Sequence, residues 1–182
     1  MNAIRRVAVM LAALAVAGGS AACGYALVGR GNTLPATVRT IGVPQFENRS
    51  PTPEIDVFIT DETRREFQGR GSLRTIPTEE GSDAVLKGII HAVDVQPSAV
   101  TADRIATSYV IIVRASVELK ETRAGGDVLW ANPSMVYRED YNIPAGQVTG
   151  DPSLAFRQDT NALQRLARNF ARSLVLQVMS GD

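Results

Sequence analysis

Apolar positions repeat with a helical period in two parts of the chain. Between Glu54 and Phe67 they recur every three or four residues, which predicts an amphipathic helix that Gly69 brings to an end. A second such stretch continues to Val178, and Asp151 followed by Pro152 is a typical helix start. We therefore expect two helices, the second long and terminal.

Shorter apolar or alternating runs predict strands in the rest of the chain, at residues 38–43, 73–76, 84–95, 105–120 and 127–140. Gly125-Gly126 separates the last two runs, which predicts a hairpin, and Pro133 predicts an edge position or a bulge. This order of elements favours an α+β fold. We expect a two-layer sandwich in β-α-β-β-β-β-α order, with two helices on a mostly antiparallel sheet of four to five strands.

The first 22 residues have the pattern of an export signal. Arg5 and Arg6 precede an apolar run at residues 7–16, and small residues follow. A membrane-spanning helix needs about 20 apolar residues, so this run is too short to span. We expect residues 1–22 to be a signal peptide that is removed from the mature protein.

The single cysteine, Cys23, stands directly after this segment. Its position resembles a bacterial lipobox, in which the cysteine becomes the acylated first residue, although Ser20 replaces the usual leucine. Several acyl chains on one residue hold a protein firmly to a membrane. We expect residues 23–36 to be a lipidated tether and residues 37–182 a single α+β domain. Gly24 follows Cys23, and in enteric bacteria the absence of Asp from that position favours export to the outer membrane.

Composition removes several classes of function. The 19 basic residues equal the 19 acidic ones, which argues against a nucleic-acid-binding protein. One cysteine and one histidine exclude an internal disulfide and disfavour a zinc site, and we expect neither a metal nor a cofactor. All but two of the basic residues are arginines, which reflects either coding bias or selection for phosphate binding.

Catalytic motifs are also missing from the sequence. It contains neither a G-x-S-x-G nucleophile motif nor a phosphate-binding loop. The only histidine, His91, lies within a predicted strand, where a structural role is the more common one. Glu139 and Asp140 are adjacent on a strand, so their side chains point to opposite faces. We expect that the protein is not an enzyme, and a hydrolase hypothesis would depend on His91.

Several segments together resemble the LptE family of lipopolysaccharide-assembly lipoproteins. They are the C-G-Y opening at Cys23, the P-x-F-x-N-R-S segment at 44–50, the D-A-x-L-x-G strand at 83–88 and the terminal helix. The resemblance implies helices on a mostly antiparallel sheet. It also implies a plug inside the outer-membrane barrel LptD, which helps to assemble that barrel and to deliver lipopolysaccharide to the outer leaflet, without covalent chemistry.

Four arginines are our candidates for contacts with the phosphates of the glycolipid. Arg104 and Arg157 lie near the ends of predicted elements, where a guanidinium can reach a ligand, and Arg123 and Arg138 are second choices. The expected partners are an LptD-like barrel, lipopolysaccharide and the membrane through Cys23. The domain would lie on the periplasmic side and within the barrel lumen. A non-catalytic periplasmic scaffold lipoprotein of another envelope or secretion complex is the alternative.

Overall fold

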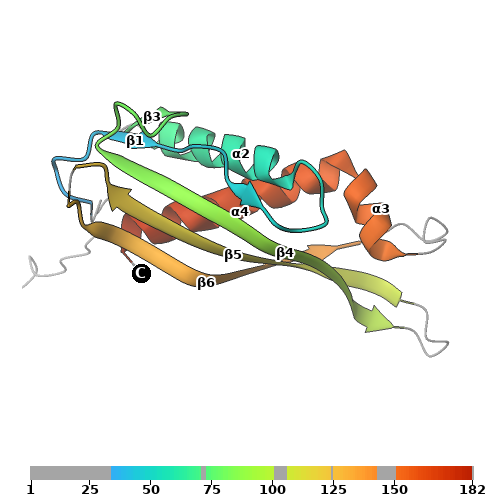
Figure 1. Cartoon of the computed structure of the whole chain (residues 1–182). Coiled ribbons are helices and arrows are strands. Elements are labelled where there is room, and N and C mark those ends of the chain that lie inside the picture. Colours follow the sequence, from blue (N-terminus) through green and yellow to red (C-terminus); the bar gives the residue numbers. More distant parts are fainter. Residues whose placement is uncertain (1–33, 71–72, 101–105, 124, 143–150, 182) are drawn as a thin grey trace, which may run out of the picture. The chain divides into compact units, whose positions relative to one another are not determined.

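The computed structural model describes residues 34–70, 73–100, 106–123, 125–142 and 151–181 (Figure 1). The chain divides into two compact units, 1–31 and 32–182, and every described residue belongs to the second. The elements of this unit are, in order, β1 (Thr40–Gly42), β2 (Glu47–Asn48), α2 (Ile55–Gly69), β3 (Arg74–Ile76), β4 (Ala84–Val100), β5 (Ala106–Glu121), β6 (Val128–Tyr141), α3 (Pro152–Gln158) and α4 (Thr160–Ser180). The predicted signal peptide and Cys23 lie outside the described residues.

The strands form one mixed sheet in the order β3-β1-β4-β5-β6, and β2 pairs further along β4. The three long strands β4, β5 and β6 are antiparallel, as predicted. In contrast, β1 runs parallel to both β3 and β4, and the sheet has six strands where four to five were expected. The parallel pairing arises because α2 carries the chain back, so β3 starts at the same end of the sheet as β1.

The first predicted strand, residues 38–43, contains β1, whereas β2 was not predicted. The two strands are separate because Phe46 packs where the ladder would otherwise continue. Residues of β1 pair with Ala84 and Val85, and those of β2 pair with Ile89 and Ile90. The Phe46 ring lies over Gly88, between these two pairings, and is buried. Its backbone N–H donates to the hydroxyl oxygen of Thr60 on α2 at 3.0 Å instead of to a strand.

Asp83 connects the start of β4 to the start of β1. Its carboxylate accepts hydrogen bonds from the backbone N–H groups of Arg39 and Thr40, each at 2.9 Å. These two bonds lower the pKa of Asp83. The D-A-x-L-x-G segment therefore begins with the residue that sets the position of β1 relative to β4.

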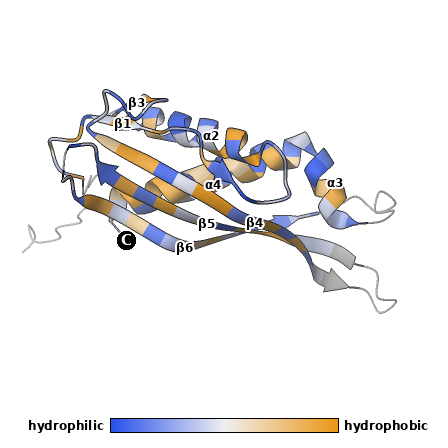
Figure 2. Cartoon of the chain, in the orientation of Figure 1, coloured by the Kyte–Doolittle hydropathy of each residue, from blue (hydrophilic) through white to orange (hydrophobic). Residues whose placement is uncertain are grey.

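Both long helices cover the same face of the sheet (Figures 1 and 2). The helix α4 buries an unbroken apolar stripe that includes Leu166, Phe170 and Leu174, and it packs closely against α2. Within the described part of the chain, no helix combines the length and apolar character needed to cross a membrane. The core therefore lies between the sheet and this helical layer, as the α+β prediction requires.

The predicted terminal helix is divided into α3 and α4, which gives three helices instead of two. Asp159 stands between them with φ −90° and ψ 87°, outside the helical region. Its carboxylate accepts a hydrogen bond from the backbone N–H of Ala162 at 3.0 Å and so caps α4. Asp151 caps α3 in the same way through Ser153, as its position predicted.

The hairpin at Gly125 and the irregularity at Pro133 were both predicted correctly. Gly125 adopts a φ of +75°, which favours glycine, and β5 and β6 pair on either side of the turn. Pro133 lies on the edge strand β6, where the register shifts between Met135 and Asn132. A proline has no N–H for the ladder, so an edge bulge accommodates it.

The Phe46–Gly88 contact gives a test of this packing. A Cβ at position 88 would lie 2.5 Å from two Phe46 ring atoms, so Gly88→Ala should destabilise the fold by about 1–3 kcal/mol through overpacking. Gly69→Ala is the matched control, because no atom lies within 4 Å of the added Cβ and alanine suits a helix better than glycine. Denaturant unfolding of the full-length variants measures both, and equal effects would contradict the packing argument.

Candidate functional site

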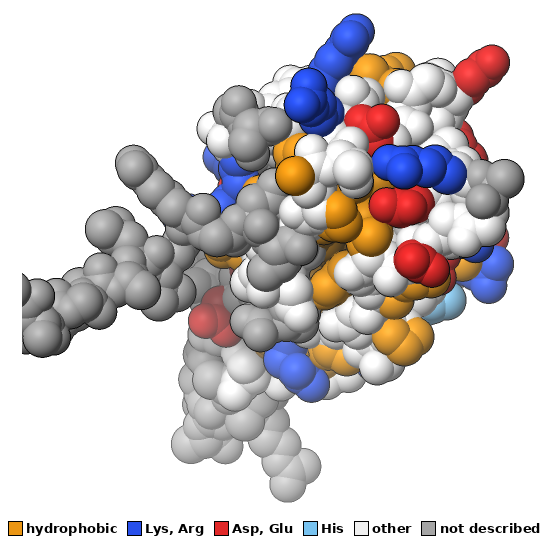
Figure 3. Space-filling model, turned by 90° about the vertical axis from the view of Figure 1, so that its left-hand side faces the viewer, with side chains coloured by type: hydrophobic (Ala, Val, Ile, Leu, Met, Phe, Trp, Pro, Cys, Tyr) orange, Lys and Arg blue, Asp and Glu red, His pale blue; other side chains and the backbone are white. Residues whose placement is uncertain are grey.

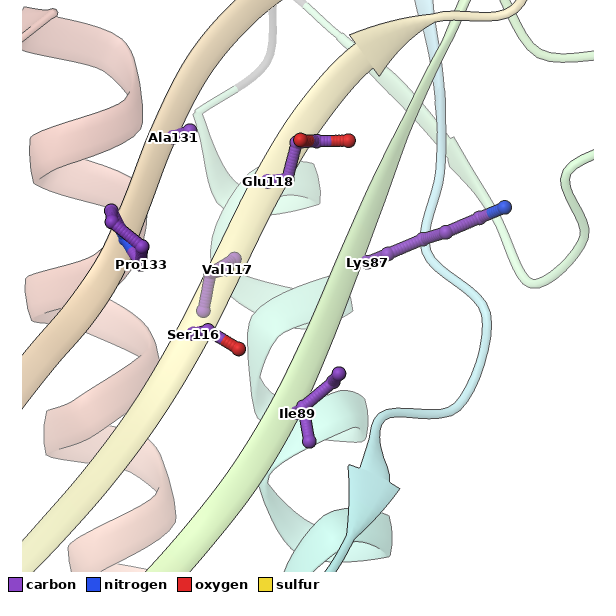
Figure 4. A pocket seen from close by; sticks show the side chains of 7 residues that line it. All are labelled: Lys87, Ile89, Ser116, Val117, Glu118, Ala131 and Pro133. Carbon is purple, nitrogen blue, oxygen red and sulfur yellow. The ribbon is translucent and has the colours of Figure 1, made fainter.

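The face of the sheet that points away from the helices carries two depressions. The first, of about 290 Å³, is drawn in Figure 4, where the helices lie behind the sheet. Residues from all three long strands line it, namely Lys87, Ile89, Ser116, Val117, Glu118, Ala131 and Pro133. It is a shallow hollow on a strand surface and holds both apolar and charged side chains.

Two bulges produce this hollow. The pairing of β4 with β5 shifts between Ile90 and Ala92, which leaves His91 out of the regular ladder. On the other side, the β6 bulge at Pro133 leaves Ser116 without a direct partner on that strand. The His91 ring then reaches across, and its Nε2 lies 2.9 Å from the Ser116 hydroxyl. Bulges redirect side chains in this way.

His91 is exposed on the strand surface, and its partner is a serine. A serine and a histidine in hydrogen-bond contact resemble part of a catalytic triad, which also needs a carboxylate bonded to the second ring nitrogen. Among the described residues, no hydrogen bond joins a carboxylate to His91. No cluster of three or more metal-binding side chains occurs in the same described segments.

A second depression of about 330 Å³ adjoins the first toward the hairpin end of the sheet. Its side chains alternate in charge, and they include both lysines of the chain together with Arg123. Lys87 forms an ion pair with Glu79 at 2.7 Å. Seen from that end, Figure 3 shows hydrophobic side chains lying among acidic and basic ones. This surface suits a partner with both polar and apolar groups.

The described candidate arginines lie on three different elements. Arg123 is exposed just after β5, Arg138 is exposed on β6, and Arg157 is half-buried in the last turn of α3. The hairpin beside Arg123 and the helix α3 lie at opposite ends of the sheet (Figure 1). These three therefore do not form one cluster, while Arg104 and Cys23 fall outside the described residues.

Glu139 joins β6 to α4 on the helical side of the sheet. Its largely buried carboxylate accepts hydrogen bonds from Tyr137 at 3.2 Å, from Arg165 Nε at 3.3 Å and from Asn169 at 3.2 Å. Asp140 is exposed, so the two acids face opposite ways as predicted. Burial, with the nearby Glu139 carboxylate, raises the pKa of Tyr137 to about 12.

Sequence reasoning missed the arginines of α4 because it searched the ends of elements. Arg165, Arg168 and Arg172 follow one another at three- and four-residue spacing, and all are exposed. The sequence of this helix shows the pattern directly, because it contains three arginines and no acidic residue.

Known structures share this arrangement of helices on a mixed sheet. A protein from Xanthomonas campestris matches with a TM-score of 0.53 at 11% identity, over 81% of this chain and 89% of its own. Lipoprotein B from Nitrosomonas europaea matches with a TM-score of 0.50 at 11% identity, over 81% of this chain and 90% of its own. These likenesses establish the fold alone. A search of curated protein sequences found no match.

The fold and its open sheet face define a two-layer α+β domain whose helices cover one side only. A family model described as LptE, lipopolysaccharide-assembly, matches residues 38–178, which is most of the described domain. The chain belongs to the LptE family. The family suggested by the sequence motifs is thereby confirmed.

The Tyr137–Glu139 contact predicts a measurable titration. Wild-type protein should contain a tyrosine with a pKa near 12, which Tyr137→Phe removes. The pKa of Tyr137 in the folded protein lies above the usual value near 10. Tyr137 therefore stabilises the folded protein at pH values below about 10, and this stabilisation is lost as the pH rises toward 12. Glu139→Gln should lower this pKa only in part, since burial is the larger cause.

Ultraviolet titration of tyrosinate in the variants and in wild type measures the shift. Tyr141→Phe is the comparison, because the pKa of Tyr141 is also raised by burial, near Asp159. A titration in which Glu139→Gln leaves the Tyr137 pKa unchanged would contradict the contact.

Proposed function

We propose that this protein is an outer-membrane lipoprotein that binds inside an LptD β-barrel, assists the assembly of that barrel and helps to deliver lipopolysaccharide to the outer leaflet. The family match over residues 38–178 is the observation that carries the proposal. In this role the protein positions its partners and carries out no covalent chemistry on the glycolipid.

The open sheet face is the surface we assign to the barrel. It spans β4, β5 and β6, the longest strands of the described domain, and none of the described helices covers it. Val136 on β6 is 46% exposed, opposite Arg114 of β5, and the shallow depressions with their mixed charges also lie on these strands. Protein interfaces combine an apolar centre with a polar rim, which matches this composition.

Cys23 is the proposed anchor. Acylation there would hold the domain beside the membrane in which the barrel resides, and the tether 23–36 would allow it to reach the lumen. The chemical reason is the free energy of burying acyl chains in lipid, about 0.8 kcal/mol for each methylene group.

Affinity purification of the tagged full-length protein from outer membranes should recover a large β-barrel protein. Val136→Arg places a charge on the sheet face and should reduce barrel recovery at least tenfold, because a buried unpaired charge costs several kcal/mol. Val57→Arg is the matched control on α2, where the side chain is similarly exposed at 42%, and should leave recovery unchanged. Partners are identified by mass spectrometry.

Two results would contradict parts of this proposal. Loss of the barrel in Val57→Arg, with normal recovery in Val136→Arg, would move the contact to the helical side. Absence of any barrel from the wild-type preparation would favour the alternative, a scaffold lipoprotein of another envelope or secretion complex.

Glycolipid binding is the second element of the proposal, with Arg104 and Arg157 as phosphate contacts and Arg123 and Arg138 as second choices. The double variant Arg104→Glu/Arg157→Glu should weaken lipopolysaccharide binding about tenfold or more, since bidentate hydrogen bonds to phosphate are replaced by repulsion. Barrel recovery should remain normal. Arg65→Glu on α2 is the control, and unchanged lipopolysaccharide binding in the double variant would remove the two arginines from the site.

A further inference from the structure

The outer side of α4 is a continuous basic surface. Arg165, Arg168 and Arg172 are exposed, and at 100° per residue their directions fall within an arc of about 60°. Leu176 lies one turn further along the same side and is 47% exposed. We refer to these four residues as the α4 arginine face. No Asp or Glu occurs between Thr160 and Ser180 to balance it.

The other long helix, α2, has arginines that are paired with acidic residues of the same helix. On α2, Arg64 pairs with Asp61 at 2.9 Å and Arg65 pairs with Glu62 at 2.5 Å, each within one helical turn. Among the described residues, neither Arg168 nor Arg172 forms an ion pair or a side-chain hydrogen bond. The arginines of α2 are thus neutralised locally, whereas Arg165 of α4 is paired with Glu139 on β6. Arg168 and Arg172 of α4 keep their charge available for another molecule.

Glu139 on β6 holds the Arg165 side chain in position. Its Nε donates to the Glu139 carboxylate, which is itself bonded to Tyr137 and Asn169. This contact uses only Nε of Arg165. The two terminal nitrogens of the guanidinium donate to no described side chain. The buried anion therefore orients Arg165 while its donors remain directed outward.

We propose that the α4 arginine face docks on the anionic phospholipid headgroups of a membrane. Three guanidinium groups on one side of a straight helix can contact a flat surface together, and each matches phosphate oxygens in a bidentate manner. Leu176 adds an apolar side chain that can enter the headgroup layer, as in interfacial helices. This surface is separate from the open sheet face assigned to the barrel.

The physical role of such a face is a second, electrostatic membrane contact. The acyl chains expected on Cys23 hold the chain to the membrane only at its tether, and a basic patch adds a contact that orients the domain on the surface. Such docking belongs to the protein before it enters the barrel, because a domain enclosed in the lumen cannot lie on the headgroup layer. It would place α4 against the membrane and leave the strands β4–β6 on the opposite side of the domain, free for another partner.

Vesicle binding of the full chain carrying Cys23→Ser, so that no lipid is attached, tests the proposal. The chain should bind vesicles of phosphatidylglycerol and phosphatidylcholine more tightly than vesicles of phosphatidylcholine alone. Arg168→Ala/Arg172→Ala should weaken binding to the anionic vesicles about 30-fold, since each arginine near such a surface contributes about fivefold. Added salt should weaken wild-type binding and narrow the difference.

The control is Arg49→Ala/Arg65→Ala, which removes the same charge from two exposed arginines that are paired with Glu47 and Glu62. It should change vesicle binding by no more than about twofold. Arg168→Lys/Arg172→Lys keeps the charge and should retain most of the binding. Thermal unfolding of each variant confirms that the fold is intact.

Equal weakening in the two alanine variants would overturn the proposal, because it would show a response to net charge alone. So would unchanged vesicle binding in Arg168→Ala/Arg172→Ala. If that variant bound vesicles normally but lost barrel recovery, the face would contact an acidic protein surface instead. Barrel recovery that persists while vesicle binding is lost supports membrane docking and leaves the proposed barrel complex unaffected.

Discussion

Burial of one face of the β4–β5–β6 sheet beneath α2 and α4 is the constraint on which the rest of this structure depends. The apolar stripe of α4 needs a flat apolar surface, and the inward side chains of the strands supply it. The Phe46 ring can then approach the sheet only where Gly88 leaves room. Since both helices lie on the same side, the opposite face of the long strands stays open to other molecules.

Two surfaces of the domain differ in shape and in charge. The sheet surface is shallow, mixed in charge and shaped by two bulges, which suits a large complementary protein surface. The outer side of α4 has a single sign of charge and a regular spacing, which suits repeated phosphate groups. In our proposals the first binds the barrel and the second binds the membrane while the domain is still outside the barrel.

Local signals in the sequence predicted the α2 helix, the Gly125 hairpin and the edge position of Pro133, because each depends on neighbouring residues. The split between β1 and β2 depends on Phe46 meeting Gly88, which are far apart in the chain, and the parallel pairing depends on the path through α2. The break at Asp159 was missed because a capping aspartate also resembles an ordinary polar helix residue. For the site, Cys23 and Arg104 remain predictions outside the described residues.

Pro133 also has a consequence for how copies of this protein behave toward each other. The strand β6 forms the free edge of a long sheet, and an uninterrupted edge invites pairing with the same strand of a second molecule. The bulge at Pro133 interrupts the row of backbone donors and acceptors near the middle of β6. Further along the strand, the side chains of Arg138 and Asp140 are charged and exposed. The edge strand of one copy is thereby kept from pairing with the same strand of a second copy.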